Sequence, residues 1–212
     1  MGNRFVMTAE QLKKYDFILL LDKSGSMGTK DCAGGSMTRW DAAKETTIAL
    51  ARKCMQFDDN GITVVPFASK FKKYENVDGG DAIIEKIFTE NEPNGSTDTA
   101  AVVKDVIDEY LATKGSATCK PIIVICVTDG VPDDEAKLVK VIVDATKKIS
   151  TREEIGLLFV QIGTDQHAHS FLKRLDDNMT NEGAALDIVS AITKDEMEDI
   201  SLTDAIIQSL TA

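Results

Sequence analysis

Short runs of apolar residues, rich in β-branched side chains, recur along the chain and alternate with longer amphipathic stretches. The five runs are Phe17–Leu21, Ile62–Phe67, Ile122–Val127, Leu157–Ile162 and Leu186–Val189. Runs of this length that lack regular polar alternation are typical of strands buried on both faces of a sheet. They therefore predict a central sheet that is covered on both sides.

Helical patterns occupy the stretches between these runs. Apolar side chains fall on one stripe over residues 40–54 and on another over residues 100–111, as in amphipathic helices. Three further helices, a small helix and a short edge strand are expected at Asp133–Ile149, His167–Asp176, Asp195–Leu210, Asp81–Phe88 and Phe71–Tyr74, respectively. Strands that alternate with helices predict an α/β fold. We expect a Rossmann-like, doubly wound sheet that is mostly parallel, has one short antiparallel edge strand and carries helices on both faces.

The chain of 212 residues can bury one large core, and no repeat, low-complexity tract or linker divides it. We expect an N-terminal arm over residues 1–14, followed by one domain over residues 15–212. The Gly-rich stretch Met27–Arg39 is predicted to form a long loop after the first strand. Long loops in compact domains are usually functional or mobile, so this loop is a candidate functional segment.

The formal net charge of −11 disfavours two classes of partner. A negative field repels phosphate backbones and anionic lipid surfaces, and no cluster of Lys or Arg interrupts it. We therefore expect neither a nucleic-acid partner nor membrane insertion. The N-terminal region holds no apolar segment that could direct export, and the four cysteines show no C-x-x-C spacing. A cytoplasmic protein with reduced thiols, favoured as a monomer, is the resulting expectation.

Side chains with hard oxygen ligands gather where predicted strands end or a helix begins. Asp22, Ser24 and Ser26 alternate after the first strand, Asp129 follows the third, and Thr97 precedes a helix. In open parallel sheets, ligands bind outside the carboxyl ends of the strands. Two carboxylates and three hydroxyls, without His or Cys, suit Mg²⁺ or Mn²⁺, with Ca²⁺ as a further possibility. This set leaves room in the coordination sphere for an anionic ligand from outside.

Local explanations exist for the same residues, because Ser, Asp and Gly also dominate turns and helix caps. Their joint appearance at three edges favours the metal site. Asp165, His167 and His169 form a D-x-H-x-H string that suits either a second, softer metal site or a loop entering a helix, and we favour the loop. The acidic residues 133–135 suit either a rim of the metal site or a helix N-terminus.

Three segments carry a resemblance to a known family: FILLLDKSGSM at residues 17–27, GSTDT at residues 95–99 and VTDG at residues 127–130. Together they resemble the metal-ion-dependent adhesion site (MIDAS) of the von Willebrand factor type A (VWA) family. The likeness spans about residues 15–210, and the late run at residues 160–177 is most similar to intracellular bacterial VWA proteins of the tellurium-resistance type.

The resemblance implies a role for each candidate ligand. Ser24 and Ser26 would coordinate the metal directly, and Asp22 would act largely through water. Thr97 and Asp129 would exchange direct and water-bridged contact as a partner carboxylate arrives, which couples metal binding to partner binding. The long loop after the first strand departs from the family pattern, and it suits a gate or a partner contact.

Three functions are compatible with these residues. The favoured one is a metal-dependent module that binds a carboxylate of a protein partner, as an adaptor or complex subunit without enzymatic activity. The alternative is a Mg²⁺-dependent phosphatase-like enzyme with Asp22 as nucleophile, but such an enzyme would want a second carboxylate where Ser24 stands. In the third, the ion is structural and only ties loops together.

Overall fold

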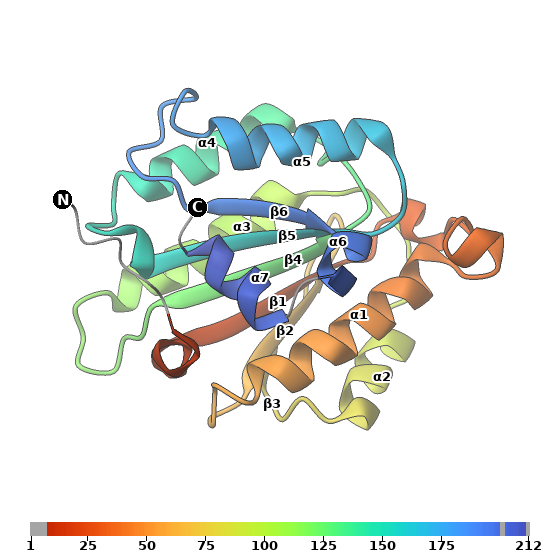
Figure 1. The fold of residues 1–212 in the computed structure, drawn as a ribbon, viewed down its shortest axis with the longest axis horizontal. Coiled ribbons are helices and arrows are strands. Elements are labelled where there is room, and N and C mark those ends of the chain that lie inside the picture. Colours follow the sequence, from red (N-terminus) through yellow and green to blue (C-terminus); the bar gives the residue numbers. More distant parts are fainter. Residues whose placement is uncertain (1–7, 200–201, 211–212) are drawn as a thin grey trace.

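A single mixed sheet forms the centre of the computed structural model, which describes residues 8–199 and 202–210 (Figure 1). Its strands are β1 (Asp16–Asp22), β2 (Ile62–Phe67), β3 (Tyr74–Val77), β4 (Ile122–Thr128), β5 (Ile155–Gln161) and β6 (Val189–Thr193). The order across the sheet is β3-β2-β1-β4-β5-β6, and only the β2–β3 pair is antiparallel. The predicted fold class, a mostly parallel doubly wound sheet with one antiparallel edge strand, is confirmed.

Both edge strands lie later in the sequence than predicted. β3 begins at Tyr74, because Phe71 makes only an isolated bridge with Phe67 and residues 68–73 are used to reverse the chain. β6 begins at Val189 and stays paired with β5 as far as Thr193. The prediction followed the apolar run and stopped where the polar Ser190 follows, although backbone pairing continues through polar residues at an edge.

The larger helices cover both faces of the sheet, and the described residues also include four short 3₁₀ helices, one before β1 and three in the connections. The α-helices are α1 (Arg39–Cys54), α2 (Asp81–Glu90), α3 (Thr99–Thr113), α4 (Glu135–Thr146), α5 (Gln166–Asn178), α6 (Lys194–Asp199) and α7 (Leu202–Ser209). The 3₁₀ helices are Ala9–Lys14, Gly25–Gly28, Ala33–Gly35 and Arg152–Glu154. The stretch predicted as one C-terminal helix contains both α6 and α7, and residues 200–201 between them lie outside the described part. None of the described helices is long and apolar enough to cross a membrane.

Alternation along β1 shows how the two cores form. Leu19 and Leu21 point into the core shared with α1, α2, α6 and α7, whereas Leu20 points into the core shared with α3, α4 and α5. Figure 1 shows the two groups of helices on opposite faces. All three leucines are at most 1% exposed, so the strand reads as an unbroken apolar run.

The strand order places the ends of β1 and β4 side by side. From β1 the chain moves outward to β2 and β3, and then returns to place β4 on the other side of β1. Leu21 pairs with Val127, so the residues that directly follow each of them lie at one edge of the sheet. This is the switch point of the strand order, where ligands bind in open α/β sheets.

The boundary at residue 14 stays a prediction, but Leu12 within the proposed arm is fully buried in the main core. We expect Leu12→Ala to lower the free energy of unfolding by about 2–4 kcal/mol, because it leaves a cavity in packed surroundings. Urea denaturation measures this change. The control is Ile83→Ala on α2, where the side chain is 37% exposed and the loss should be below about 1 kcal/mol. Equal losses in both variants would show that the arm adds nothing to the core.

Candidate metal-binding site

The carboxylate of Asp22 lies at the end of β1 and is fully buried. Its Oδ1 accepts a hydrogen bond from the backbone N–H of Ser24 at 2.8 Å, and its Oδ2 accepts one from the hydroxyl of Thr128 at 2.6 Å. Burial raises the pKa of Asp22 to about 6, although these hydrogen bonds lower it in part. An ionised carboxylate at this position therefore needs further compensation, which a bound cation would supply.

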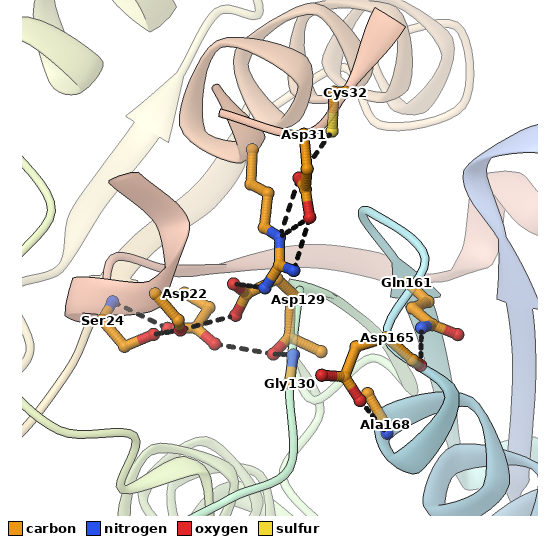
Figure 2. A network of polar contacts seen from close by, with 12 residues as sticks. Asp22, Ser24, Asp31, Cys32, Asp129, Gly130, Gln161, Asp165 and Ala168 are labelled. Atoms are coloured by element: carbon orange, nitrogen blue, oxygen red, sulfur yellow. Dashed lines mark hydrogen bonds and ion pairs between the residues drawn. The ribbon is translucent and has the colours of Figure 1, made fainter. Parts of the chain in front are cut away.

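The two serines continue a chain of oxygen atoms from β1 to β4. The hydroxyls of Ser24 and Ser26 lie 3.0 Å apart, and Ser26 donates to Oδ1 of Asp129 at 3.0 Å. Figure 2 shows the side chains of Asp22, Ser24 and Asp129 turned toward one another. A short 3₁₀ helix at Gly25–Gly28 turns the chain here, so the serine hydroxyls face the end of β4.

Thr97 is brought to the same edge through its backbone. The amide of Gly25 donates to the carbonyl of Gly95 at 3.0 Å, which ties the segment before α3 to the serine loop. The amide of Thr97 donates to both carboxylate oxygens of Asp133 at 3.0 Å, and Thr97 is 9% exposed. The structure thus joins Asp22, Ser24, Ser26 and Asp129 by hydrogen bonds and anchors Thr97 beside them through Asp133.

Of the acidic residues 133–135, the last two form the N-terminus of α4, whereas Asp133 contacts the candidate ligand Thr97. Helix α4 begins at Glu135 and is capped by Asp134, whose side chain accepts from the amide of Lys137 at 2.8 Å. Asp133 lies before the cap and bonds both backbone groups of Thr97. Its carboxylate accepts from the Thr97 amide, and its own amide donates to the Thr97 carbonyl at 3.0 Å. Its role is therefore to fix a candidate ligand.

Arg39 is the main feature that sequence reasoning missed. Its Nη1 donates to Oδ2 of Asp129 at 2.7 Å, while its Nε and Nη2 donate to the carboxylate oxygens of Asp31 at 2.6–3.1 Å. The Asp31 contact raises the pKa of the guanidinium, and the same hydrogen bonds lower the pKa of the Asp31 carboxyl. A signal was present in the sequence: Arg39 is the first residue of α1, where a cation opposes the helix dipole and so needs another reason to be there.

The D-x-H-x-H string caps a helix. Asp165 accepts hydrogen bonds from the amides of His167 at 2.8 Å and Ala168 at 2.9 Å, and it begins α5 (Figure 2). The Nδ1 of His169 lies 3.3 Å from the amide oxygen of Gln161. Across the described residues, no three His, Cys, Asp or Glu side chains group in a way that could hold a metal. The candidate site has two carboxylates and otherwise depends on hydroxyls.

The oxygen spacing fits a small divalent cation. In an octahedron with Mg–O bonds of 2.0–2.1 Å, neighbouring ligand atoms lie about 2.9 Å apart, whereas Ca–O bonds of 2.3–2.6 Å give about 3.3–3.7 Å. The Ser24–Ser26 and Ser26–Asp129 oxygen separations are both 3.0 Å. Hydrogen bonds between these groups also give a separation of 3.0 Å. Mg²⁺ or Mn²⁺ could therefore replace the hydrogen bonds without any rearrangement of these oxygens.

Comparison with known proteins identifies a family. The family model described as "vWA-TerF-like: vWA found in TerF C terminus" matches residues 14–211. Similar solved structures include an aerotolerance-related membrane protein from Bacteroides fragilis NCTC 9343, which is 14% identical with a TM-score of 0.61 over 92% of this chain and 98% of that chain. Manganese-loaded Plasmodium vivax TRAP protein is 18% identical with a TM-score of 0.60, and the match covers 95% of this chain and 74% of that chain. The SpRpn10 VWA domain is 13% identical with a TM-score of 0.59, and the match covers 92% of this chain and 94% of that chain. These structural likenesses concern the fold alone, and no curated protein matches the chain.

Asp22 makes stability depend on pH when metal is removed. Its folded pKa of about 6 exceeds the model-peptide value of 3.8, so the folded state binds the proton more tightly and loses stability as pH rises through 4–6. In chelator, we expect Asp22→Asn to gain about 1–2 kcal/mol relative to the unmutated protein between pH 4.5 and pH 7.5. Urea denaturation at the two pH values measures the difference. A constant difference would mean that Asp22 ionises as it does in the unfolded chain.

A substitution at Gly163 tests whether the side chain of Arg39 is held in one position. Its φ is +78°, and a Cβ there would lie 2.9 Å from Nε of Arg39. Gly183 has a similar φ of +99° but open space around it, so Gly183→Ala carries the backbone strain alone. We expect Gly163→Ala to cost about 1–2 kcal/mol more than Gly183→Ala in urea denaturation, because the clash disturbs the contacts of Arg39. Equal costs would show that the guanidinium moves aside freely.

Proposed function

This chain belongs to the family of vWA domains found in the TerF C terminus, and from that premise we propose that it is a metal-dependent protein-binding module. In this proposal the chain holds Mg²⁺ or Mn²⁺ and recognises a carboxylate of a protein partner through the ion. The proposed ligands are Asp22, Ser24, Ser26, Thr97 and Asp129. The cytoplasmic location and monomeric state expected from the sequence stay predictions.

The observation that carries the proposal is the run of side-chain oxygens Ser24–Ser26–Asp129, each 3.0 Å from the next. Asp22 is tied to the start of this run by the backbone amide of Ser24, which donates to its Oδ1 at 2.8 Å. Ser24 and Ser26 would hold the ion directly, and Asp22 would orient the loop and bind largely through water. Because the hydroxyls are neutral, these ligands leave the ion with charge to share. A bound cation supplies an electrophilic position for an anionic oxygen.

Two comparisons support this function. VWA domains are generally protein-interaction modules without enzymatic activity, and the chain matches that family over residues 14–211. The TRAP protein of Plasmodium vivax, which shares the fold, was solved with manganese bound. A divalent ion is thus compatible with a domain of this architecture.

The phosphatase-like alternative fits the geometry less well. The side chain of Asp22 is fully buried, and hydrogen bonds hold both of its oxygens, so it is poorly placed to attack a phosphate. Ser24 stands where a second acid–base carboxylate is wanted. We therefore favour binding over catalysis, and Mg²⁺-dependent hydrolysis of a generic phosphate ester that Asp22→Asn abolishes would reverse this preference.

Calorimetric titration with Mn²⁺ and Mg²⁺ tests the metal site. We expect one ion per chain, and we expect Ser26→Ala to weaken binding by about tenfold because one ligand is lost. The matched control is Ser36→Ala in the same loop, whose hydroxyl donates only to the carbonyl of Ala33 at 2.8 Å. Ser36→Ala should leave the affinity unchanged. Equal effects of the two substitutions would count against a site at Ser26.

Partner recognition needs a separate measurement. Proteins retained from a lysate on immobilised chain in Mg²⁺ should be lost in chelator and with Asp22→Ala. If Asp129→Ala lowers thermal stability in Mg²⁺ while every retained protein remains, the ion only ties loops together and the binding proposal is wrong.

A further inference from the structure

Arg39 joins the long loop after β1 to the candidate site. Its guanidinium uses the Nε and Nη2 edge for Asp31, which lies in the loop, and Nη1 for Asp129, which lies at the end of β4. The Asp129 side chain is fully buried and that of Arg39 is 13% exposed. An arginine fork held on one carboxylate by two nitrogens has a fixed direction, so Asp31 aims Nη1 at Asp129.

Both oxygens of Asp129 already have hydrogen-bond donors. Oδ1 accepts from the hydroxyl of Ser26 at 3.0 Å, and Oδ2 accepts from Arg39 at 2.7 Å. A carboxylate that shares its charge with a guanidinium offers less charge to a metal ion beside it. The ion then keeps more of its own charge for an anionic ligand.

We propose that Arg39 is a positioning residue that restrains Asp129 and leaves the bound ion more attractive to a partner carboxylate. This inference rests on the proposed function and adds to it the residue that sets the balance between metal affinity and carboxylate affinity. The positive charge of Arg39 repels the metal and attracts the carboxylate. Arg39 therefore affects the two affinities in opposite directions.

Asp31 extends this control to the Met27–Arg39 loop. Its side chain is 31% exposed, and its charge offsets that of Arg39. A backbone bridge between Cys32 and Met37 closes the loop next to Asp31. Any rearrangement that separates Asp31 from Arg39 leaves the guanidinium charge uncompensated beside the site. The loop thus influences the ion through one ion pair, with no need to contact the ion.

The test measures two affinities on the full chain. Calorimetry gives the affinity for Mn²⁺ alone. The broadening of the acetate methyl proton resonance by protein-bound Mn²⁺ gives the affinity for a simple carboxylate. We expect Arg39→Gln to bind Mn²⁺ about tenfold more tightly and acetate about tenfold more weakly, because one positive charge is removed within a partly buried site. Arg39→Lys loses the fork that Asp31 holds but keeps the positive charge, so its Mn²⁺ affinity should stay within about threefold of the unmutated protein if the charge sets that affinity.

Two further variants separate the charge of Arg39 from other effects. Arg52→Gln makes the same charge change on α1, but Arg52 pairs with Asp81 at the exposed surface, so both affinities should stay unchanged. Asp31→Asn keeps Arg39 and removes its compensation, so we expect weaker Mn²⁺ binding and stronger acetate binding. If Arg39→Gln fails to fold, Asp31→Asn still tests the proposal through this reversed pattern.

Parallel losses of both affinities in Arg39→Gln, or unchanged affinities in both Arg39→Gln and Asp31→Asn, would overturn the inference and leave the proposed function standing. If the unmutated protein binds no Mn²⁺ that Asp22→Asn removes, the proposed function fails, and the role of Arg39 fails with it. Opposite shifts of the two affinities support the inference, because a merely structural role of Arg39 lowers both together.

Discussion

Two carboxylates, Asp22 and Asp129, are buried at adjacent strand ends, and most of the local structure serves to make that burial tolerable. An unpaired buried charge is strongly destabilising, so each oxygen needs a donor. Thr128 and the Ser24 amide serve Asp22, while a serine hydroxyl and Arg39 serve Asp129. The one full positive charge among these donors belongs to Arg39, which also pairs with the carboxylate of Asp31. These groups together therefore keep a net negative charge, which is compatible with the proposed cation.

The sheet holds these groups in place because it is buried on both faces. Parallel strands β1 and β4 are in register from Asp16 with Ile122 to Leu21 with Val127, so the separation of their ends is set by the backbone and not by loop flexibility. Helices α1, α4 and α5 follow the strands and begin at this same edge, where their N-termini carry positive partial charge. That arrangement favours an anionic ligand at this edge, whereas it disfavours Arg39 in the first turn of α1. Its two acidic partners account for its position.

Strands and candidate ligands could be predicted from the sequence because both depend on local patterns. Runs such as Ile122–Val127 show burial directly, and ligands that follow strand ends must meet at one edge. β6 was misplaced because backbone pairing, not side-chain polarity, decides where it ends. β3 was misplaced because residues 68–73 reverse the chain before the strand begins. The Arg39–Asp129 and Thr97–Asp133 contacts join residues 90 and 36 positions apart. No local pattern encodes such pairs, although a cation at a helix start hinted at the first.

The negative net charge of the chain opposes the binding of an acidic partner, so the local geometry of the site has to overcome it. A protein with a net charge of −11 repels an acidic partner at long range, and salt screens that repulsion beyond about 10 Å. Under the proposed function, recognition of a carboxylate would have to be decided at contact, where a bound ion and Arg39 would outweigh the distant acidic residues. A fold shared with proteins 13–18% identical does not supply such a balance by itself. In our proposal it would depend on individual side chains, above all the Asp31–Arg39 pair that ties the loop after β1 to Asp129.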